Sequence, residues 1–183
     1  MLDTIHSSRR DYKKSSFHKG LNLFSIRSNK DSFLNLIQKT LMATYEGSCF
    51  CGEIKVEVDG EPDAMVVCHC TVCRSWSASP VNGATIFKPE NVKIVRGKDK
   101  LKSYAKNSGH ERSWCESCGG HVLTDHTESY GFMDVYCSIL EDFEFKPTAH
   151  FNYENTILPI KDGLPKFKDF PKEMGGSGEM LEE

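Results

Sequence analysis

The sequence predicts an all-β fold, built from several small antiparallel sheets around metal sites, and two observations carry this prediction. From Tyr45 onward, short runs in which polar and apolar residues alternate are separated by Gly, Pro, Asn and Asp. This is the pattern of half-buried strands joined by turns. Seven of the eight cysteines also lie in three close clusters, a spacing typical of metal ligands.

The strand predictions follow from this alternation. Residues 53–59 alternate without interruption, and the turn Gly60-Glu61-Pro62 follows them, so they should form a half-buried strand. No long helical period occurs after residue 45, so the body of the chain should be mainly antiparallel β structure. Further strands are predicted at residues 64–68, 84–87, 92–95, 101–105, 111–114, 121–124, 132–139 and 149–153.

Composition divides the chain into three parts. Residues 1–41 are rich in serine and carry eight Lys or Arg against three Asp or Glu. We interpret them as a basic N-terminal extension: a leader, an upstream start before the internal Met42, or a transit peptide. Residues 42–172 hold the cysteines and the predicted strands and should form one zinc-binding domain. Residues 173–183, with the stretch GGSGEMLEE, are predicted to be a polar C-terminal tail.

Charge, hydropathy and cysteine content narrow the function classes. A formal net charge of −3 argues against a general nucleic-acid binder, and no apolar run approaches the ~20 residues that span a bilayer. The N-terminus lacks the continuous apolar segment of a secretory signal peptide. We therefore expect a reducing compartment, in which clustered thiols bind metal rather than form disulfides. The expected location is the cytoplasm, or mitochondria or plastids if residues 1–41 are a transit peptide.

Two of the cysteine clusters together could form a four-thiolate zinc site. In a strand, residues i and i+2 face the same side, so a Cys-x-Cys pair can reach one ion while the residue between them points away. A Cys-x2-Cys pair followed by glycine is a familiar zinc knuckle, because glycine permits a left-handed turn around the ion. Four thiolates close the coordination sphere, so this zinc should be structural. The expected ligands are Cys49, Cys51, Cys115 and Cys118.

The stretch CHCTVC contains the remaining cluster, Cys68, Cys70 and Cys73, with no evident fourth ligand. Three protein ligands and a vacant position are the pattern of a catalytic zinc site. Three thiolates outweigh the charge of the ion, so this zinc should be a weak Lewis acid that suits a soft sulfur ligand. A substrate thiol in the fourth position would be held deprotonated near neutral pH.

The alternative is that a fourth protein ligand completes a second closed site. His69 fits worst, because in an extended segment it points away from the side of its two cysteine neighbours. Cys137, in DVYCSIL, is expected to be a buried strand cysteine. The other candidates are His121 and His126.

The chain resembles the glutathione-dependent formaldehyde-activating enzymes and their relatives, which include centromere protein V. The resemblance runs from about Tyr45 to Pro171 and rests on GSCFCGEI, VCHCTVCR, GKDKLKSYAKNSGHERSWCESCGGHV and HFNYENTILPIKDGLPKF. It implies an Mss4-like β-tent with two Zn²⁺ per chain, one structural and one in the active site, divided among the cysteines as above. It also implies carbon–sulfur lyase chemistry, such as the formation of S-hydroxymethylglutathione from glutathione and formaldehyde. After Cys73 the chain reads RSWSAS, where many relatives carry Lys and Gly, beside the expected substrate site.

We therefore expect a zinc-dependent lyase in which glutathione, or another small thiol, binds through sulfur at the zinc of the CHCTVC cysteines and adds to an aldehyde. Arg74 either pairs with a substrate carboxylate or supports the loop, and His69 or His121 could move the proton. The alternatives are a thiol-binding carrier without catalysis and a protein-interaction module. The expected partners are a small thiol and an aldehyde, with neither nucleic acid nor membrane. The sequence does not indicate the oligomeric state.

Overall fold

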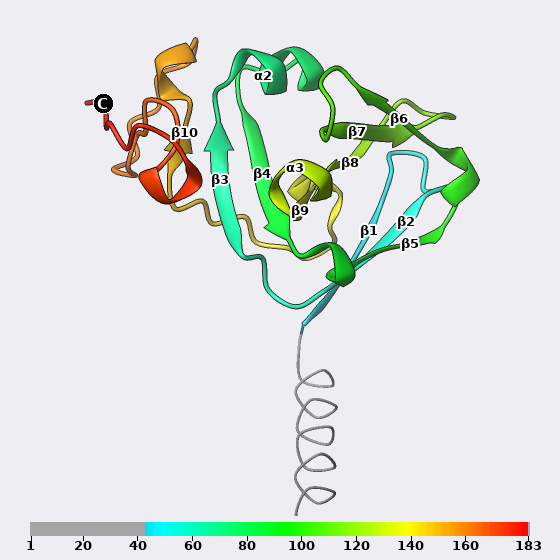
Figure 1. Ribbon diagram of the computed structural model, residues 1–183. Helices are drawn as coiled ribbons and strands as arrows, with labels where there is room; N and C mark the ends of the chain where they lie inside the picture. Colours follow the sequence, from blue (N-terminus) through cyan, green and yellow to red (C-terminus); the bar gives the residue numbers. More distant parts are fainter. Residues whose placement is uncertain (1–42, 183) are drawn as a thin grey trace, which may run out of the picture. The chain divides into compact units, whose positions relative to one another are not determined.

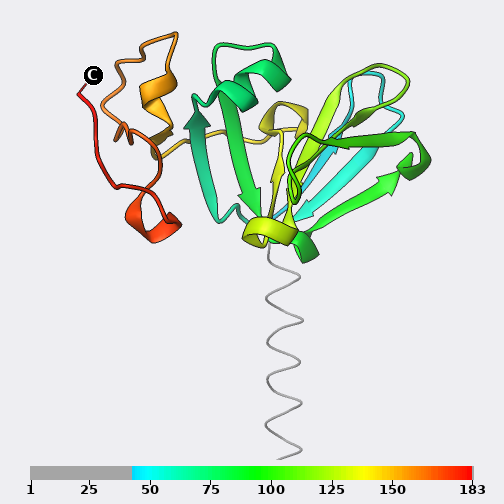
Figure 2. The same ribbon diagram turned by 45° about the horizontal axis from the view of Figure 1, so that its top comes forward.

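The computed structural model describes residues 43–182, so the predictions made for residues 1–41 lie outside the described residues. The described residues form two β-sheets with a few short helices (Figures 1 and 2). The fold is therefore mainly β, and the predicted fold class is confirmed. The smaller sheet is antiparallel, in the order β1-β2-β5, and comprises β1 (Thr44–Ser48), β2 (Lys55–Asp59) and β5 (Val92–Arg96).

The larger sheet has seven strands in the order β10-β3-β4-β9-β8-β7-β6, and only its β10–β3 pair is parallel. Its strands, in chain order, are β3 (Ala64–Cys68), β4 (Asn82–Phe87), β6 (Leu101–Ala105), β7 (Glu111–Cys115), β8 (His121–His126), β9 (Phe132–Val135) and β10 (His150–Phe151). In both views the C-terminal segment, orange to red, lies beside β3, at the end of the large sheet away from the small sheet (Figures 1 and 2).

The helices are short connections between strands. None of those in residues 43–182 is long and apolar enough to cross a membrane. They are α2 (Thr71–Ser77), α3 (Thr127–Tyr130) and the 3₁₀ turns η1 (Pro89–Asn91), η2 (Lys98–Lys100), η3 (Cys137–Ile139), η4 (Tyr153–Asn155) and η5 (Lys172–Met174).

The main core joins the two sheets. Val56 and Val58 of β2, in the small sheet, form one buried cluster with Phe87, Val122 and Val135 of β4, β8 and β9 in the large sheet. All five side chains are almost completely inaccessible to water. Burial of each such side chain contributes about 1.5–3 kcal/mol, so this shared cluster is the main force that holds the sheets together.

A second, smaller core attaches the C-terminal segment to the large sheet. Val66 and Ala84 cluster with Phe151, and Phe167 and Phe170 pack against them. Residues 173–182, predicted to be a polar tail, hydrogen-bond back to this segment: the amide of residue 168 donates to the carbonyl of residue 179, and that of residue 181 to residue 166, each at 2.8 Å. The C-terminal residues are therefore part of the domain.

Two local predictions need correction. The run at residues 132–139 is not one strand: β9 ends at Val135, and Cys137 begins η3 and is only half-buried. The chain turns there because it bridges to the small sheet through Gly47 and Leu140. Helix α2 was also missed, because it has only seven residues and none of them is buried, so it leaves no apolar period in the sequence.

Candidate functional site

The first site is a four-cysteine cluster, formed by Cys49, Cys51, Cys115 and Cys118, whose Sγ atoms all lie within 4.8 Å of one another. The sequence paired these residues correctly, but the expected strand geometry of Cys49 and Cys51 is wrong, since both lie in the turn between β1 and β2. Phe50 between them points into solvent, with 92% of its surface exposed. The turn therefore directs both thiols to the same cluster and Phe50 away from it, as a strand would have done.

The geometry of the four-cysteine cluster fits a tetrahedral zinc ion. A Zn–S distance of about 2.3 Å gives sulfur–sulfur edges of about 3.8 Å. The Sγ of Cys51 lies 3.6 Å from that of Cys49 and 3.8 Å from that of Cys115. The amides of Ile54 and Gly120 point at the sulfurs of Cys49 and Cys118, at 3.3 and 3.4 Å, and such bonds stabilise thiolates. The donor set and its spacing therefore suit this metal.

The knuckle at Cys118 shows how the sequence builds this geometry. Gly119 has φ of +71°, the left-handed conformation that glycine adopts without strain, and its amide donates to the carbonyl of Cys115 at 2.8 Å. The Gly120 amide bond is the main cause that lowers the pKa of the Cys118 thiol to about 7. A thiol with such a pKa is readily deprotonated for metal binding near neutral pH.

The second site is a three-cysteine cluster, formed by Cys68, Cys70 and Cys73, whose Sγ atoms also lie within 4.8 Å of one another. Cys68 ends β3, Cys70 caps the N-terminus of α2, and Cys73 lies in its first turn. The Sγ of Cys70 accepts the amide hydrogen of Cys73 at 3.2 Å, as an aspartate or serine would at this position. The strand-to-helix turn thus brings the three thiols together.

Hydrogen bonds among the three thiols separate their acidities. The neighbouring thiols of Cys68 and Cys73 lower the pKa of Cys70 to about 2. The same contacts, together with burial, raise the pKa of Cys68 well above its usual value. Ionisation of one thiol therefore disfavours ionisation of the other two, so a cation between the sulfurs is needed to hold all three as thiolates.

No fourth Cys, His, Asp or Glu donor joins the three-cysteine cluster among residues 43–182. His69 is fully buried and turned away from the cluster. His121 stacks on Trp76, with ring centroids 4.3 Å apart, and burial lowers its pKa. His126 is hydrogen-bonded to His110 at 2.8 Å instead.

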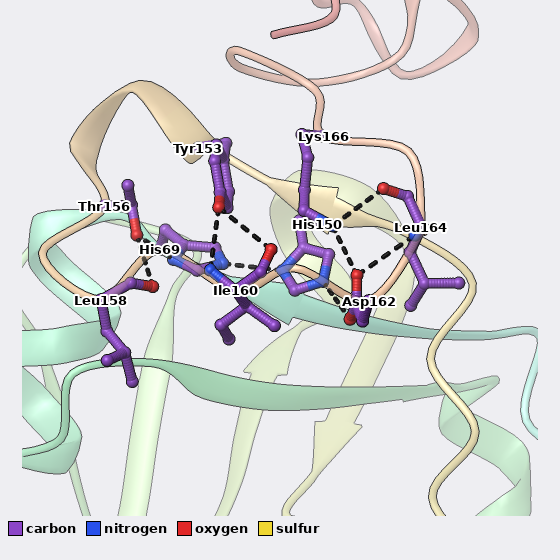
Figure 3. A network of polar contacts seen from close by, with 9 residues as sticks. All are labelled: His69, His150, Tyr153, Thr156, Leu158, Ile160, Asp162, Leu164 and Lys166. Carbon is purple, nitrogen blue, oxygen red and sulfur yellow. Dashed lines mark hydrogen bonds and ion pairs between the residues drawn. The ribbon is translucent and has the colours of Figure 1, made fainter. Parts of the chain in front are cut away.

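The imidazole of His69 belongs to a largely buried network of polar side chains (Figure 3). Its Nε2 lies 2.8 Å from Nδ1 of His150, and its Nδ1 lies 2.9 Å from the hydroxyl of Thr156. His150 continues the chain to Asp162, 2.9 Å from its Nε2, and Asp162 pairs with the buried ammonium of Lys166. The loop that carries Cys68 and Cys70 is thus anchored through His69 to residues 150–166.

Charge is balanced inside this network. Burial acts to raise the pKa of Asp162, but the bonds from Lys166, His150 and the Leu164 amide together outweigh it and lower the pKa, so the carboxylate is ionised. Burial, and then the neighbouring His150, lower the pKa of His69 to about 4, so His69 is neutral. The sequence alone does not predict this network, although CHCTVC contains His69 and the stretch KDGLPK contains Asp162 and Lys166.

Arg74 supports the same loop. Its Nε donates to the carbonyl oxygen of His69 at 2.9 Å. It also lines a cavity of about 450 Å³, together with Thr71 of α2 and Ile157, which follows η4. One edge of the guanidinium is therefore occupied by the protein backbone, which matches the loop-supporting alternative considered for this residue.

A cavity of about 780 Å³ is lined by Cys49 of the four-cysteine cluster and by neighbours of the three-cysteine cluster, whose own cysteines are not among its lining residues. On one side it is lined by Asn82, the cross-strand partner of Cys68, and by Ser77, whose hydroxyl donates to the carbonyl of Cys73 at 2.8 Å. On the other side Cys49 and Gly120 line it. No Lys, Arg, Asp or Glu among the described residues lines this cavity, so it can take a small, uncharged polar group.

Comparison with known proteins supports a single family. The model of the family described as glutathione-dependent formaldehyde-activating enzyme matches residues 44–155. An uncharacterised lyase of Schizosaccharomyces pombe is 32% identical over 86 residues, which are 47% of this chain and 61% of that protein. The match therefore spans less than two thirds of the length of this curated relative.

Among solved structures, a crystal structure of a Rhodobacter sphaeroides protein is 23% identical, with a TM-score of 0.46, and the match covers 54% of this chain and 90% of that one. The family model covers more than half of the chain and includes both cysteine clusters. The chain belongs to the glutathione-dependent formaldehyde-activating enzyme family.

Proposed function

We propose that this protein is a zinc-dependent carbon–sulfur lyase, which forms or breaks the bond between a small thiol and the carbon of an aldehyde. The observation that carries the proposal is the three-cysteine cluster, which has three sulfur donors and no fourth Cys, His, Asp or Glu donor among residues 43–182. Its neighbours Ser77 and Asn82 line a cavity that has no Lys, Arg, Asp or Glu among its described lining residues. Membership of the family supports glutathione and formaldehyde as the substrates, and the Schizosaccharomyces pombe relative is named a lyase.

The two clusters would divide the work. The four-cysteine cluster has a full set of ligands, so a zinc ion there would be structural. Zinc in the three-cysteine cluster would keep one position for the sulfur of the substrate and hold it as a thiolate. Cys68, Cys70 and Cys73 would thus be the catalytic ligands, as the sequence predicts.

The reaction itself needs little more than placement. The thiolate sulfur forms a bond to the carbonyl carbon, the carbonyl electron pair moves to oxygen, and that oxygen takes up a proton to give a hemithioacetal. Ser77, Asn82 and Tyr136 supply hydroxyl and amide groups to the cavity, and such groups can hydrogen-bond the aldehyde oxygen. Holding the two reactants side by side removes the entropic cost of their encounter, which is a large share of the barrier.

The test is exchange NMR on glutathione mixed with ¹³C-labelled formaldehyde, with the zinc-loaded protein and with Cys70→Ser. The intact protein should speed interconversion of free aldehyde and S-hydroxymethylglutathione, and Cys70→Ser should not. Cys137→Ser removes a thiol outside both clusters and should keep the full zinc content. An unchanged exchange rate in the zinc-loaded protein, with glutathione bound, would instead identify a thiol carrier.

A further inference from the structure

A second binding surface lies between α2 and the β6–β7 hairpin. Tyr104 of β6 and Arg112 of β7 are cross-strand partners, so their side chains stand on the same face of the hairpin. Val72 and Trp76, four residues apart on one side of α2, line the same cavity of about 520 Å³ as these two residues. The hairpin face and the helix therefore form the two walls of a groove.

The groove is positively charged. Lys106 and Arg112 are the charged side chains that line it among the described residues, and neither forms an ion pair with a carboxylate within 4 Å there. Lys102 stands on the same hairpin face but is paired with Glu116 at 3.3 Å. Glu111 stands on the opposite face, where it accepts a hydrogen bond from a serine hydroxyl at 3.2 Å.

Arg112 interacts with two residues outside the groove, His110 and Asp134. The guanidinium donates to the carbonyl of His110 at 3.3 Å, which leaves other N–H groups for a ligand. Asp134 interacts with Arg112 electrostatically but is itself buried and accepts the amide hydrogen of Thr85 at 2.8 Å. Burial favours the neutral form of Asp134, so it offsets only part of the positive charge.

The groove lies beside the helix that carries two of the three thiols. Cys70 caps α2 and Cys73 lies in its first turn, and Thr71 and Val72, the two residues between them, line the groove. A neighbouring cavity of about 410 Å³ shares Trp76 and Tyr104 with the groove. Lys106 and Arg112 therefore face the same helix that presents Cys70 and Cys73 to the cluster.

We propose that Lys106 and Arg112 bind a carboxylate of the thiol substrate, so that the site selects thiols carrying a carboxylate several bonds away from the sulfur. This deepens the proposed function and rests on it for the position of the sulfur. Arg74, the residue that the sequence suggested for this role, lines a different cavity, and its Nε bonds the His69 carbonyl. The carboxylate site is thus on the β6–β7 hairpin and not on α2.

The chain offers a direct reporter for the test. Of its two tryptophans, Trp76 lines the groove and Trp114 lines the neighbouring cavity, so their fluorescence should report a ligand there. The zinc-loaded protein is titrated with S-methylglutathione, in which a methyl group replaces the thiol hydrogen. It is also titrated with the diethyl ester of the same compound, which lacks both carboxylates. The variants are Lys106→Gln and Arg112→Lys. The control is Lys98→Gln, which removes the same charge from an exposed residue outside the groove.

We expect Lys106→Gln to weaken binding of S-methylglutathione about three- to fivefold, the range of an exposed charge pair. Arg112→Lys should weaken it about tenfold, because lysine cannot make the paired bonds of a guanidinium to a carboxylate. Lys98→Gln should bind as the unaltered protein does, and the ester should bind weakly and equally to all. If Arg112→Lys does not fold, the comparison of Lys106→Gln with Lys98→Gln still tests whether the groove binds the carboxylate.

Equal affinity for the acid and its ester, or equal weakening by Lys98→Gln and Lys106→Gln, would overturn the proposal. Neither result depends on catalysis, because S-methylglutathione cannot add to an aldehyde. A failure of the exchange NMR experiment would therefore contradict the lyase activity and leave the carboxylate site standing. If catalysis is retained but the acid and the ester bind equally well, the lyase activity stands and the carboxylate site is contradicted.

Discussion

The free energy of ionising a single side chain in this protein depends on its surroundings, and Asp134 is the clearest case. It lies in β9, is nearly inaccessible to water, and accepts the amide hydrogen of Thr85 at 2.8 Å. Burial raises its pKa to about 7, although the Thr85 bond and the charge of Arg112 act in the opposite direction. An ordinary aspartate in the unfolded chain has a pKa near ~3.9. Between these two pKa values the folded protein therefore holds a proton on Asp134 that the unfolded chain has released.

The sign of the resulting pH dependence follows directly. Between about pH 4 and pH 7 the folded state holds more protons, so the free energy of unfolding falls as the pH rises, by up to about 1.4 kcal/mol per pH unit. Asp134→Asn keeps an acceptor for the Thr85 amide and removes the titration. The stability of Asp134→Asn relative to the unaltered protein should rise from pH 5 to pH 7 and level off above it, as measured by urea unfolding. Asp63→Asn, at an exposed position, is the control, and a constant difference for Asp134→Asn would contradict the prediction.

At the scale of elements, the turn from β3 to α2 depends on a strand and turns far along the chain. The buried His69 side chain connects this turn to β10, to η4 and to residues 162–166 (Figure 3). Thr156, Asp162 and Lys166 lie beyond residue 155, where the family match ends. Part of the support for the three-cysteine cluster thus comes from outside the matched region.

His150→Gln tests this support. It removes the ring that joins His69 to Asp162 and leaves buried polar groups without a partner, so the turn carrying Cys68 and Cys70 should loosen. We expect a chelator to release one zinc ion per chain about tenfold faster, the lower range for the loss of an outer hydrogen-bond partner of a metal site. Release is followed with a coloured zinc indicator.

The matched control is His126→Gln. It makes the same chemical change in the other His–His contact, His110 with His126, also joined at 2.8 Å, on a different part of the large sheet. Only the His150 variant should change the release of one zinc ion. Faster release in both variants, or in neither, would mean that the network does not position the three-cysteine cluster.

At the scale of the whole molecule, the four-cysteine cluster joins the two sheets. Cys49 follows β1 of the small sheet, and Cys115 ends β7 of the large sheet. A metal ion between them would therefore act together with the shared apolar core to hold the β1–β2 turn to the large sheet. Structural zinc sites of this kind contribute directly to folding.

Cys115→Ser and Cys70→Ser should consequently have different effects. Cys115→Ser should lose one zinc ion and speed hydrogen exchange throughout β1, β2 and β5, or unfold the domain outright. Cys70→Ser should also lose one zinc ion but leave exchange in the small sheet unchanged, because its cluster lies at the end of β3 and the start of α2 and takes no residue from the small sheet. Hydrogen exchange with mass spectrometry, together with zinc analysis, makes the comparison. Equal loss of protection in the two variants would contradict the division into structural and reactive sites.

The sequence by itself determined the properties that depend on local pattern. Alternation and turn residues located most strands, since side chains in a strand point to opposite faces in turn. Cysteine spacing divided seven thiols into the two clusters that the structure contains, because neighbouring ligands of one metal ion must be close along the chain or share a turn. The weak points were local too: α2 is short and buries nothing, and Cys137 lies in a 3₁₀ turn instead of a strand.

The tertiary structure alone decided what depends on contacts between distant segments. The network from His69 to Lys166 joins residues almost a hundred positions apart, and no periodicity in the sequence reports such a contact. The same holds for the groove, in which α2 meets the face of the β6–β7 hairpin: Lys106 and Arg112, for which we propose the carboxylate, line it, and Arg74 lines a different cavity. Local pattern sets which side of an element a residue faces, but packing sets what that side faces.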